Sequence, residues 1–302
     1  MIIVCGVKSE QPIALLLSAL RRKGVDYLLI NQSDLFRSIR LRWKLSQDGI
    51  SGKIKVGPEV VDVKEIRSVY QRFMSIDQIP VPPNKPEYIG HTRSVLLSLI
   101  DLFDIIPARI VNRRRSMMSN NSKPYQSILI RKAGFSIPDT LITNVPDEAN
   151  DYVDKHTHVI YKSISAIRST VKKVDNEDKE RFKNLVFLPT QFQKMISGDN
   201  VRVHVVGDKV FATKINTTVI DYRYAHIENE NPEFEVYQLS PQLEKMCVDL
   251  TENLGLLFSG IDLIITNKET YCLEVNTSPA YSYYQQRTGQ PISEALADLL
   301  ST

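Results

Sequence analysis

Apolar and polar positions at the start of the chain alternate in blocks that predict a strand–helix–strand unit. Residues 2–5 form a continuous apolar run typical of a buried strand, and Ile13 to Lys23 have the period of an amphipathic helix. A second strand is expected at 27–30, and two more at 50–56 and 69–73. No G-x-G-x-x-G sequence follows the first strand, so this unit gives no support for a dinucleotide site.

After the proline-rich segment IPVPPNKP, the pattern continues to alternate between helices and strands. We expect helices at 91–103, 119–134, 241–254 and 291–300, and strands after Pro138, at 159–164, in a hairpin at 201–215 and in two runs within 260–276. Residues 165–187 are polar and charged, which favours a mobile loop and an exposed helix. The predicted fold class is α/β, with domain boundaries near 118 and 190.

The composition is typical of a folded soluble protein and excludes several function classes. Of 302 residues, 42% are hydrophobic, and Lys plus Arg outnumber Asp plus Glu by only 38 to 35. This bias is too small to indicate nucleic-acid binding, and the basic run Arg113–Arg115 has no aromatic stacking platform. The most apolar segment, SVLLSLIDLFDIIPARIV, contains two aspartates, so no membrane span is expected. Three widely spaced cysteines and the lack of a signal-peptide pattern favour reduced thiols and a cytoplasmic location.

The segment GIDLIITNKETYCLEVNTSP, residues 260–279, predicts a hairpin with three oxygen-bearing side chains on one face. Side chains alternate along a strand, so Glu274 and Asn276 share a face, while Leu273 and Val275 are expected against the core. A three-residue turn would place Asp262 opposite Glu274, and a five-residue turn would place it opposite Asn276. A four-residue turn would break this arrangement.

Converging carboxylates repel one another unless a cation lies between them, and hard oxygen ligands of this kind suit Mg²⁺. The alternative is that the polar side chains simply face water, as one face of an antiparallel hairpin often does. Similarly, Lys162 could point inward and neutralise phosphate oxygens, or it could be a surface lysine on an edge strand. The other motifs of the chain distinguish between these alternatives.

Several motifs occur in an order that resembles the ATP-grasp ligases: Lys123, Lys162, QKMI, NVRVHVVGDKVFA, DYR, Asp262 and EVN. The segments NNSKPYQSILIRKAGFSIPDTLITN, FLPTQFQKMI and TGQPISEALADLL are most similar to the microviridin-type graspetide synthetases of the RimK-like branch. This resemblance implies an ATP-grasp fold with three lobes. They are a pre-ATP-grasp N-terminal domain at 1–118, a central domain at 119–190 and a C-terminal domain at 191–302.

The resemblance also implies which residues hold the metal ions and act on phosphate. Asp262, Glu274 and Asn276 match the ligands of two Mg²⁺ ions. Arg202 and Arg223 match catalytic arginines that face the γ-phosphate and the acyl phosphate, where a guanidinium fork suits charge spread over several oxygens.

The nucleotide itself would contact a second group of matching residues. Lys123 and Lys162 would contact phosphate oxygens, and Ser163 and Ser165 would cover them, although the glycines of many phosphate loops are absent. The adenine and ribose would contact Gln193, Lys194, Met195, Ile196 and Asn200. The family usually has Glu in place of Lys194, so backbone recognition of the adenine would survive but a contact by that acidic side chain would be lost. It has Asp in place of Asn200, and an asparagine can still accept a hydrogen bond from the ribose.

Such an enzyme uses ATP to convert a carboxylate into an acyl phosphate, which a hydroxyl or an amine then attacks. The microviridin-type resemblance implies that the carboxylate is an Asp or Glu side chain of a ribosomal precursor peptide, whose own Ser, Thr or Lys closes an ester or amide ring. A leader segment of that peptide would dock on the central domain of a homodimeric enzyme. The alternatives are a ligase that adds an amino acid or amine to a peptide or small acid, and an ATP-binding regulator without catalysis.

Overall fold

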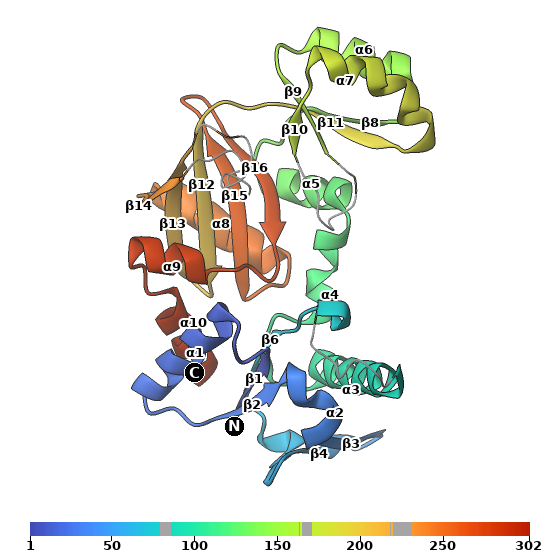
Figure 1. The fold of residues 1–302 in the computed structure, drawn as a ribbon. Helices are drawn as coiled ribbons and strands as arrows, with labels where there is room; N and C mark the ends of the chain where they lie inside the picture. The colour runs from blue at the N-terminus through green and yellow to red at the C-terminus, as the bar shows by residue number, and fades with distance from the viewer. Residues whose placement is uncertain (79–85, 163, 165–170, 218, 220–230) are drawn as a thin grey trace.

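The computed structural model describes residues 1–78, 86–162, 164, 171–217, 219 and 231–302. They form an N-terminal, a central and a C-terminal part, each built around its own β-sheet (Figure 1). The central part projects at one end of the molecule, and the C-terminal sheet lies between it and the N-terminal part. The α/β class predicted from the sequence is confirmed.

The N-terminal part contains a four-stranded parallel sheet in the order β2-β1-β6-β7. Its elements are β1 (Ile2–Gly6), α1 (Gln11–Arg22), β2 (Tyr27–Asn31), α2 (Leu35–Ser38), β6 (Ser68–Arg72), α3 (Pro86–Ile105), β7 (Arg109–Val111) and α4 (Arg114–Met117). Ile3, Val4 and Val69 are fully buried, as expected for parallel strands that are covered on both faces.

A second, antiparallel sheet of this part was predicted only in its middle strand. It consists of β3 (Ile39–Ser46), β4 (Gly49–Val56) and β5 (Glu59–Asp62). Strand β3 is difficult to recognise in the sequence because IRLRWKLS contains several charged residues. They lie on the exposed face of the strand, while Trp43 faces α3. Trp43 Nε1 donates a hydrogen bond to Ser98 Oγ at 3.0 Å.

The central part is a four-stranded sheet in the order β10-β9-β11-β8. Its elements are β8 (Thr140–Thr143), α6 (Pro146–Lys155), β9 (Val159–Lys162), β10 (Lys172–Lys173), α7 (Asn176–Arg181) and β11 (Thr190–Lys194). The core is small and centres on Phe192 of β11, whose ring meets that of Phe182 with the centroids 5.3 Å apart. Because β9 is an interior strand, Lys162 is not on a sheet edge.

The C-terminal part is a five-stranded antiparallel sheet in the order β14-β13-β12-β15-β16. Its elements are β12 (Asp199–Val206), β13 (Lys209–Asn216), β14 (Glu233–Val236), α8 (Pro241–Asn253), β15 (Phe258–Ile265), β16 (Thr270–Asn276), α9 (Ser282–Thr288) and α10 (Ile292–Ser301). One face packs on α8 through Val201, Val203 and Leu250. Alternation along β12 therefore directs Asn200 and Arg202 to the opposite face.

Two helices connect parts of the chain that are distant in sequence. Helix α5 (Lys123–Lys132) packs against β16 of the C-terminal sheet, and Ile130 belongs to that core. Helix α10 packs against α1, where Leu296 and Leu16 share one buried cluster. The division into domains at 118 and 190 therefore stays a prediction.

The remaining expectations concern helix limits, membrane spans and thiols. The helix expected at 119–134 begins at Lys123, because Ser122 is its N-cap and Ser122 Oγ accepts the Tyr125 N–H. None of the helices described is long and apolar enough to cross a membrane. Cys5, Cys247 and Cys272 are free and buried, and burial raises the pKa of each thiol.

Candidate nucleotide and metal site

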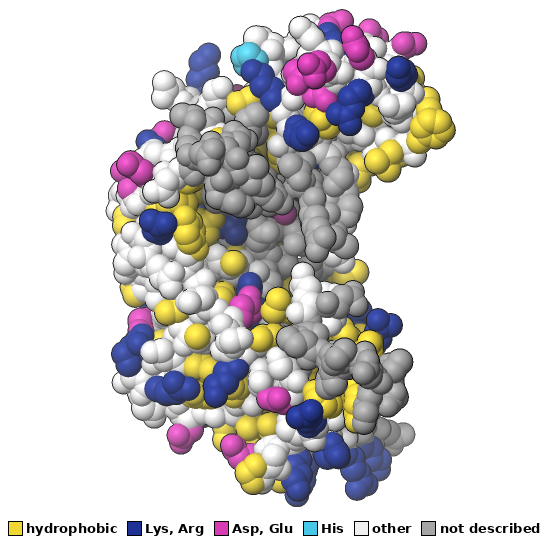
Figure 2. Space-filling view, viewed as in Figure 1, with side chains coloured by type: hydrophobic (Ala, Val, Ile, Leu, Met, Phe, Trp, Pro, Cys, Tyr) yellow, Lys and Arg dark blue, Asp and Glu magenta, His cyan; other side chains and the backbone are white. Residues whose placement is uncertain are grey.

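A pocket of about 1320 Å³ opens between the central and C-terminal sheets. Figure 2 shows the molecule hollowed on one side, below the projecting central part. Every described residue of the predicted site lines this pocket: Lys123, Lys162, Gln193, Lys194, Met195, Ile196, Asn200, Arg202, Asp262, Glu274 and Asn276. The predicted Ser163, Ser165 and Arg223 lie outside the described residues.

The β15–β16 hairpin has neither of the two turn lengths considered from the sequence, yet it has one of the two pairings, that of Asp262 with Glu274. Ile265 pairs with Thr270, so the turn has four residues, and a β-bulge interrupts the register between Asp262 and Leu263. The bulge adds one residue on β16 and shifts the pairing by one position. As a result Asp262 lies opposite Glu274, which is the arrangement that a four-residue turn alone would have broken.

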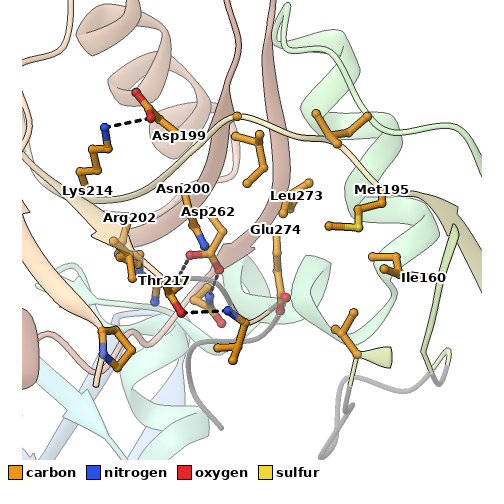
Figure 3. A pocket seen from close by; sticks show the side chains of 18 of the residues that line it. Ile160, Met195, Asp199, Asn200, Arg202, Lys214, Thr217, Asp262, Leu273 and Glu274 are labelled. Atoms are coloured by element: carbon orange, nitrogen blue, oxygen red, sulfur yellow. Dashed lines mark hydrogen bonds and ion pairs between the residues drawn. The ribbon is translucent and has the colours of Figure 1, made fainter. Parts of the chain in front are cut away.

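Because of the bulge, the position predicted for Leu273 is wrong. Alternation along β16 predicted that Leu273 would pack in the core with Val275, but Cys272 takes that place and Leu273 lines the pocket beside Glu274. A bulge leaves two consecutive residues of one strand facing a single residue of its neighbour, so both can be directed to the same side. Figure 3 shows Leu273 and Glu274 directed into the pocket together.

Each carboxylate of the candidate metal cluster has a cation beside it. Arg202 Nη1 donates to Asp262 Oδ1 at 2.5 Å, and Lys123 Nζ lies 3.8 Å from Glu274 Oε2. The second oxygen of Asp262 accepts a hydrogen bond from Asn276 Nδ2 at 3.2 Å. The three oxygen-bearing side chains are thus close together, and two carboxylates with one carboxamide oxygen form a donor set that fits Mg²⁺.

Arg202 is held by the register of the C-terminal sheet and by a glycine. It pairs with Asp262 across β12 and β15, and its side chain is buried. A Cβ atom at Gly260 would come within 2.7 Å of Arg202 Nη2, so the close approach of the guanidinium requires glycine there. The Arg202 Cζ lies 5.7 Å from the centre of the Tyr284 ring, which gives the cation an aromatic surface.

Lys162 is directed into the pocket by the side chain of a neighbouring strand. Lys162 Nζ donates to Gln193 Oε1 at 3.2 Å, and Gln193 Nε2 donates to Thr140 Oγ1 at 3.0 Å. Gln193 is buried, so its carboxamide has one orientation in this chain of hydrogen bonds. Lys162 therefore points inward, and only 9% of this residue is exposed.

The connection from β11 to β12 forms the apolar end of the pocket. Figure 3 shows Met195 and Ile160 on one side, with Arg202 and Asp262 on the other. The Lys194 N–H donates to the Asp139 carbonyl at 2.9 Å, and the Met195 N–H donates to that of His158 at 3.0 Å.

The Ile196 N–H makes neither of these bonds and has no partner among the described residues, so it is a donor that the connection offers to a ligand. The Lys194 side chain is exposed.

Sequence reasoning missed several pocket residues. Ile160, Ile264 and Leu273 are apolar and resemble core residues in the sequence, although they face the pocket. Lys214 and Asp199 form an ion pair of 2.9 Å at its rim (Figure 3). Alternation along the strands could have identified Ile160 and Ile264. Each lies two residues from a predicted site residue on the same strand and therefore shares its face.

The two sheets and the charged pocket between them define the protein as an ATP-grasp ligase. A family model described as the RimK-like ATP-grasp domain matches residues 120–300, which is more than half of the chain. The chain therefore belongs to the RimK-like ATP-grasp family, as the sequence predicted.

The most informative similar structures cover almost the whole chain. The macrocyclase MdnC bound with precursor peptide MdnA, from Microcystis aeruginosa MRC, is 22% identical with a TM-score of 0.81, over 100% of this chain and 99% of that one. A RiPP-associated ATP-grasp ligase of Chryseobacterium gregarium, in complex with ADP and a leader and core peptide, is 21% identical with a TM-score of 0.82, over 99% and 96%. At these identities the likeness establishes the fold, including the N-terminal part.

The curated relatives carry another name. A probable alpha-L-glutamate ligase of Cellvibrio japonicus (strain Ueda107) is 31% identical over 107 residues, and the match spans 35% of this chain and 35% of that protein. A probable alpha-L-glutamate ligase 1 of Shewanella sp. (strain MR-4) is 23% identical over 215 residues, 67% of this chain and 70% of that protein. ATP-grasp ligases use ATP and Mg²⁺, in agreement with the cofactors predicted from the sequence.

Proposed function

We propose that this protein is an ATP-dependent ligase that activates side-chain carboxylates of a ribosomal precursor peptide and closes ester or amide rings within that peptide. The observation that supports this best is the convergence of Asp262, Glu274 and Asn276 with Arg202 and Lys123 at one end of a single pocket. The apolar end of the pocket, around Met195, suits a purine ring. The pocket thus has one end for a base and another for phosphates.

The proposed reaction has two steps. An oxygen of the substrate carboxylate attacks the γ-phosphorus of ATP, the bond from that phosphorus to the ADP oxygen breaks, and an acyl phosphate forms. A hydroxyl or amine of the substrate then attacks the acyl carbon, and phosphate leaves with the bonding electron pair and takes up the proton that the nucleophile loses. Mg²⁺, held by Asp262, Glu274 and Asn276 as two ions, would supply positive charge that offsets the repulsion between carboxylate and triphosphate.

The residues of the chain have distinct roles in this proposal. Lys123 and Lys162 orient the phosphates, and Arg202, together with Arg223, stabilises the charge on the phosphoryl group that is transferred. The Ile196 N–H binds the adenine edge, while Met195 and Leu273 pack on the ring. Asn200 accepts a hydrogen bond from the ribose, and Ser165 covers the phosphates. No side chain acts as a covalent nucleophile.

The choice of a peptide substrate rests on the structural neighbours. MdnC is bound with a precursor peptide and the Chryseobacterium ligase is in complex with a leader and core peptide, and both match this chain over nearly its full length. We extend the proposal to a leader segment that docks on the central domain, and to a homodimer. The alternative is addition of a glutamate or another amino acid to a peptide, which the names of the curated relatives favour.

The metal cluster is tested with Glu274→Gln, which keeps the shape of the side chain and removes its charge. We expect loss of ADP formation by at least about a hundredfold, because electrostatic stabilisation of this kind is worth several kcal/mol. The matched control is Glu252→Gln on the exposed face of α8, which should leave the rate unchanged. Retained turnover in Glu274→Gln, with far-UV circular dichroism like that of the wild type, would remove Glu274 from the site.

The substrate class is tested by co-expression with candidate precursor peptides rich in Ser, Thr, Asp and Glu, followed by mass spectrometry. Ring closure removes one water for every ester or amide formed, whereas addition of an amino acid increases the mass by that residue. A peptide of unchanged mass would count against both reactions.

A further inference from the structure

The loop that follows the last metal ligand forms one wall of the pocket. Ser278, Pro279 and Ala280 line it, directly after Asn276. Met195 lies at the apolar end of the pocket, and this loop borders the other half, which a substrate carboxylate must enter to reach the terminal phosphate of ATP. The position of this wall therefore determines how the carboxylate is oriented towards that phosphate.

Arg72, the last residue of β6 in the N-terminal sheet, binds this loop through one nitrogen. Arg72 Nη1 donates to the Ser278 carbonyl at 2.8 Å, to Ser278 Oγ at 3.2 Å and to the Pro279 carbonyl at 3.2 Å. The other side of the guanidinium binds Glu10, whose Oε1 accepts a hydrogen bond from Nε at 2.8 Å and forms an ion pair with Nη2, also at 2.8 Å. One side chain thus joins the N-cap residue of α1 to the pocket wall.

Two further contacts from the N-terminal part hold the ends of the same loop. Asn112 Nδ2 donates to the Thr277 carbonyl at 2.7 Å, and Tyr281 Oη donates to the Pro12 carbonyl at 2.6 Å. Asn112 and Tyr281 are both buried, so these bonds are shielded from water. Arg72 binds the middle of the loop, and it is the contact nearest to the residues that face the pocket.

We infer that Arg72 is a positioning residue, through which the N-terminal part fixes the wall of the acid-binding half of the pocket. This inference rests on the proposed function. A lysine could not replace it, because an ammonium is a single point of charge and cannot bind the carboxylate of Glu10 and two loop carbonyls on opposite sides. Glu10 sets the orientation of the Arg72 guanidinium, so the Glu10 carboxylate also contributes to positioning the loop.

The test compares Arg72→Ala, Arg72→Lys and Glu10→Gln with the matched control Arg109→Ala. Arg109 lies on the neighbouring strand β7 and also joins the N-terminal sheet to the C-terminal part, since its Nη1 donates to the Leu299 carbonyl at 2.8 Å. It does not line the pocket. Both alanine variants remove an arginine between the same two parts, but only Arg72→Ala frees the loop.

We expect Arg72→Ala to raise the KM for the peptide about tenfold to a hundredfold, because a loop that must become ordered on binding costs affinity, with Arg72→Lys close to it and Glu10→Gln intermediate. The Kd for Mg·ADP should stay within about twofold, because the loop is far from the purine end. Arg109→Ala should change neither value. Equal effects of Arg72→Ala and Arg109→Ala on KM would overturn the inference in favour of a general role in stability.

Hydrogen exchange separates this inference from the proposed function, because it needs no peptide turnover. The amides of Ala280 and Tyr281 should exchange faster in Arg72→Ala than in the wild type or in Arg109→Ala. If the wild type modifies no peptide but the loop loosens in Arg72→Ala alone, the ligase proposal fails and the positioning role stands. Unchanged exchange in Arg72→Ala overturns the positioning role, whatever the wild type does.

Discussion

Gln126 of α5 binds both backbone groups of Val275, with its Oε1 accepting the Val275 N–H and its Nε2 donating to the Val275 carbonyl, each at 2.9 Å. Val275 lies between Glu274 and Asn276, and Lys123 lies almost one turn before Gln126 on the helix. One buried carboxamide therefore sets the distance between the lysine and the strand that carries Glu274 and Asn276. The helix acts as an additional neighbour of β16, whose other side pairs with β15.

We predict that Gln126→Ala lowers both stability and metal affinity. The change leaves the Val275 N–H and carbonyl without their partner, at a cost of about 1–3 kcal/mol for each unsatisfied group. The concentration of Mg²⁺ needed for half-maximal ADP formation should rise, since Glu274 and Lys123 lose their alignment. Chemical denaturation measures the first effect and a magnesium titration the second.

Gln32 offers a matched control in the N-terminal part. It is buried and makes the same pair of bonds with Met74, at 2.7 and 2.8 Å. Gln32→Ala should cost similar stability while leaving the Mg²⁺ requirement unchanged. An equal shift of the Mg²⁺ requirement in both variants would mean that the effect of Gln126 comes from stability alone.

Gly260→Ala should impair catalysis by displacing Arg202. The added methyl would lie 2.7 Å from Arg202 Nη2 and 2.7 Å from Pro279 Cβ, which is closer than real contacts allow. We expect the rate of ADP formation to fall by about tenfold or more, since one transition-state contact is weakened by about 1.4 kcal/mol or more. Gly90→Ala serves as the control, because a Cβ there meets nothing within 4 Å and the helix gains stability. A fully active Gly260→Ala enzyme would show that Arg202 need not occupy this position.

His204 should make the stability of the protein depend on pH. It is fully buried between Arg202, Phe258 and Tyr284, and neither ring nitrogen has a hydrogen-bond partner among the described residues. Burial, with a smaller contribution from the charge of Arg202, holds the pKa of His204 well below its usual value.

Below about pH 6.5 the unfolded chain binds a proton at this histidine that the folded chain does not bind. Its contribution to stability is therefore fully present above that pH and is lost as the pH falls towards the lowered pKa of the folded state. The loss reaches up to about 1.4 kcal/mol for each pH unit.

His204→Phe should remove this dependence, because phenylalanine keeps an aromatic ring at the site and takes up no proton. Urea denaturation at several values between about pH 5 and 8 measures the slope of stability with pH in both proteins. His91→Gln, on the exposed side of α3, is the control and should keep the wild-type slope. If His204→Phe also keeps that slope, His204 is not the group responsible.

Leu273→Ala should weaken nucleotide binding without displacing Asp262 and Glu274. The side chain of Leu273 faces the apolar end of the pocket because of the bulge, while Asp262 and Glu274 are paired through the backbone. Removing it should cost roughly 1–2 kcal/mol of contact with the purine, which is about tenfold in the Kd for ADP. Calorimetry measures this change, and Leu45→Ala, at an exposed site, should leave the Kd unaltered. An unchanged Kd in Leu273→Ala would place the base elsewhere.

The sequence by itself determined the family, the α/β class and most of the candidate site. Alternation placed Glu274 and Asn276 on one face of a strand, and the order of the motifs supplied Arg202 and Asn200. These inferences succeed because they depend on local geometry and on motifs that keep their order. The pocket brings together every predicted residue that the structure describes, whereas Ser165 and Arg223 lie outside those residues and remain predictions.

Only the tertiary structure decided the features that depend on distant parts of the chain. The bulge that restores the pairing of Asp262 with Glu274 is invisible in the alternation, because one extra residue reverses the expected direction of Leu273. Gln126 binds a strand 149 residues away, and Arg72 binds a loop 206 residues away. Such contacts join a side chain to backbone groups. Because almost every residue type carries the same backbone groups, the pattern of residue types does not predict these contacts.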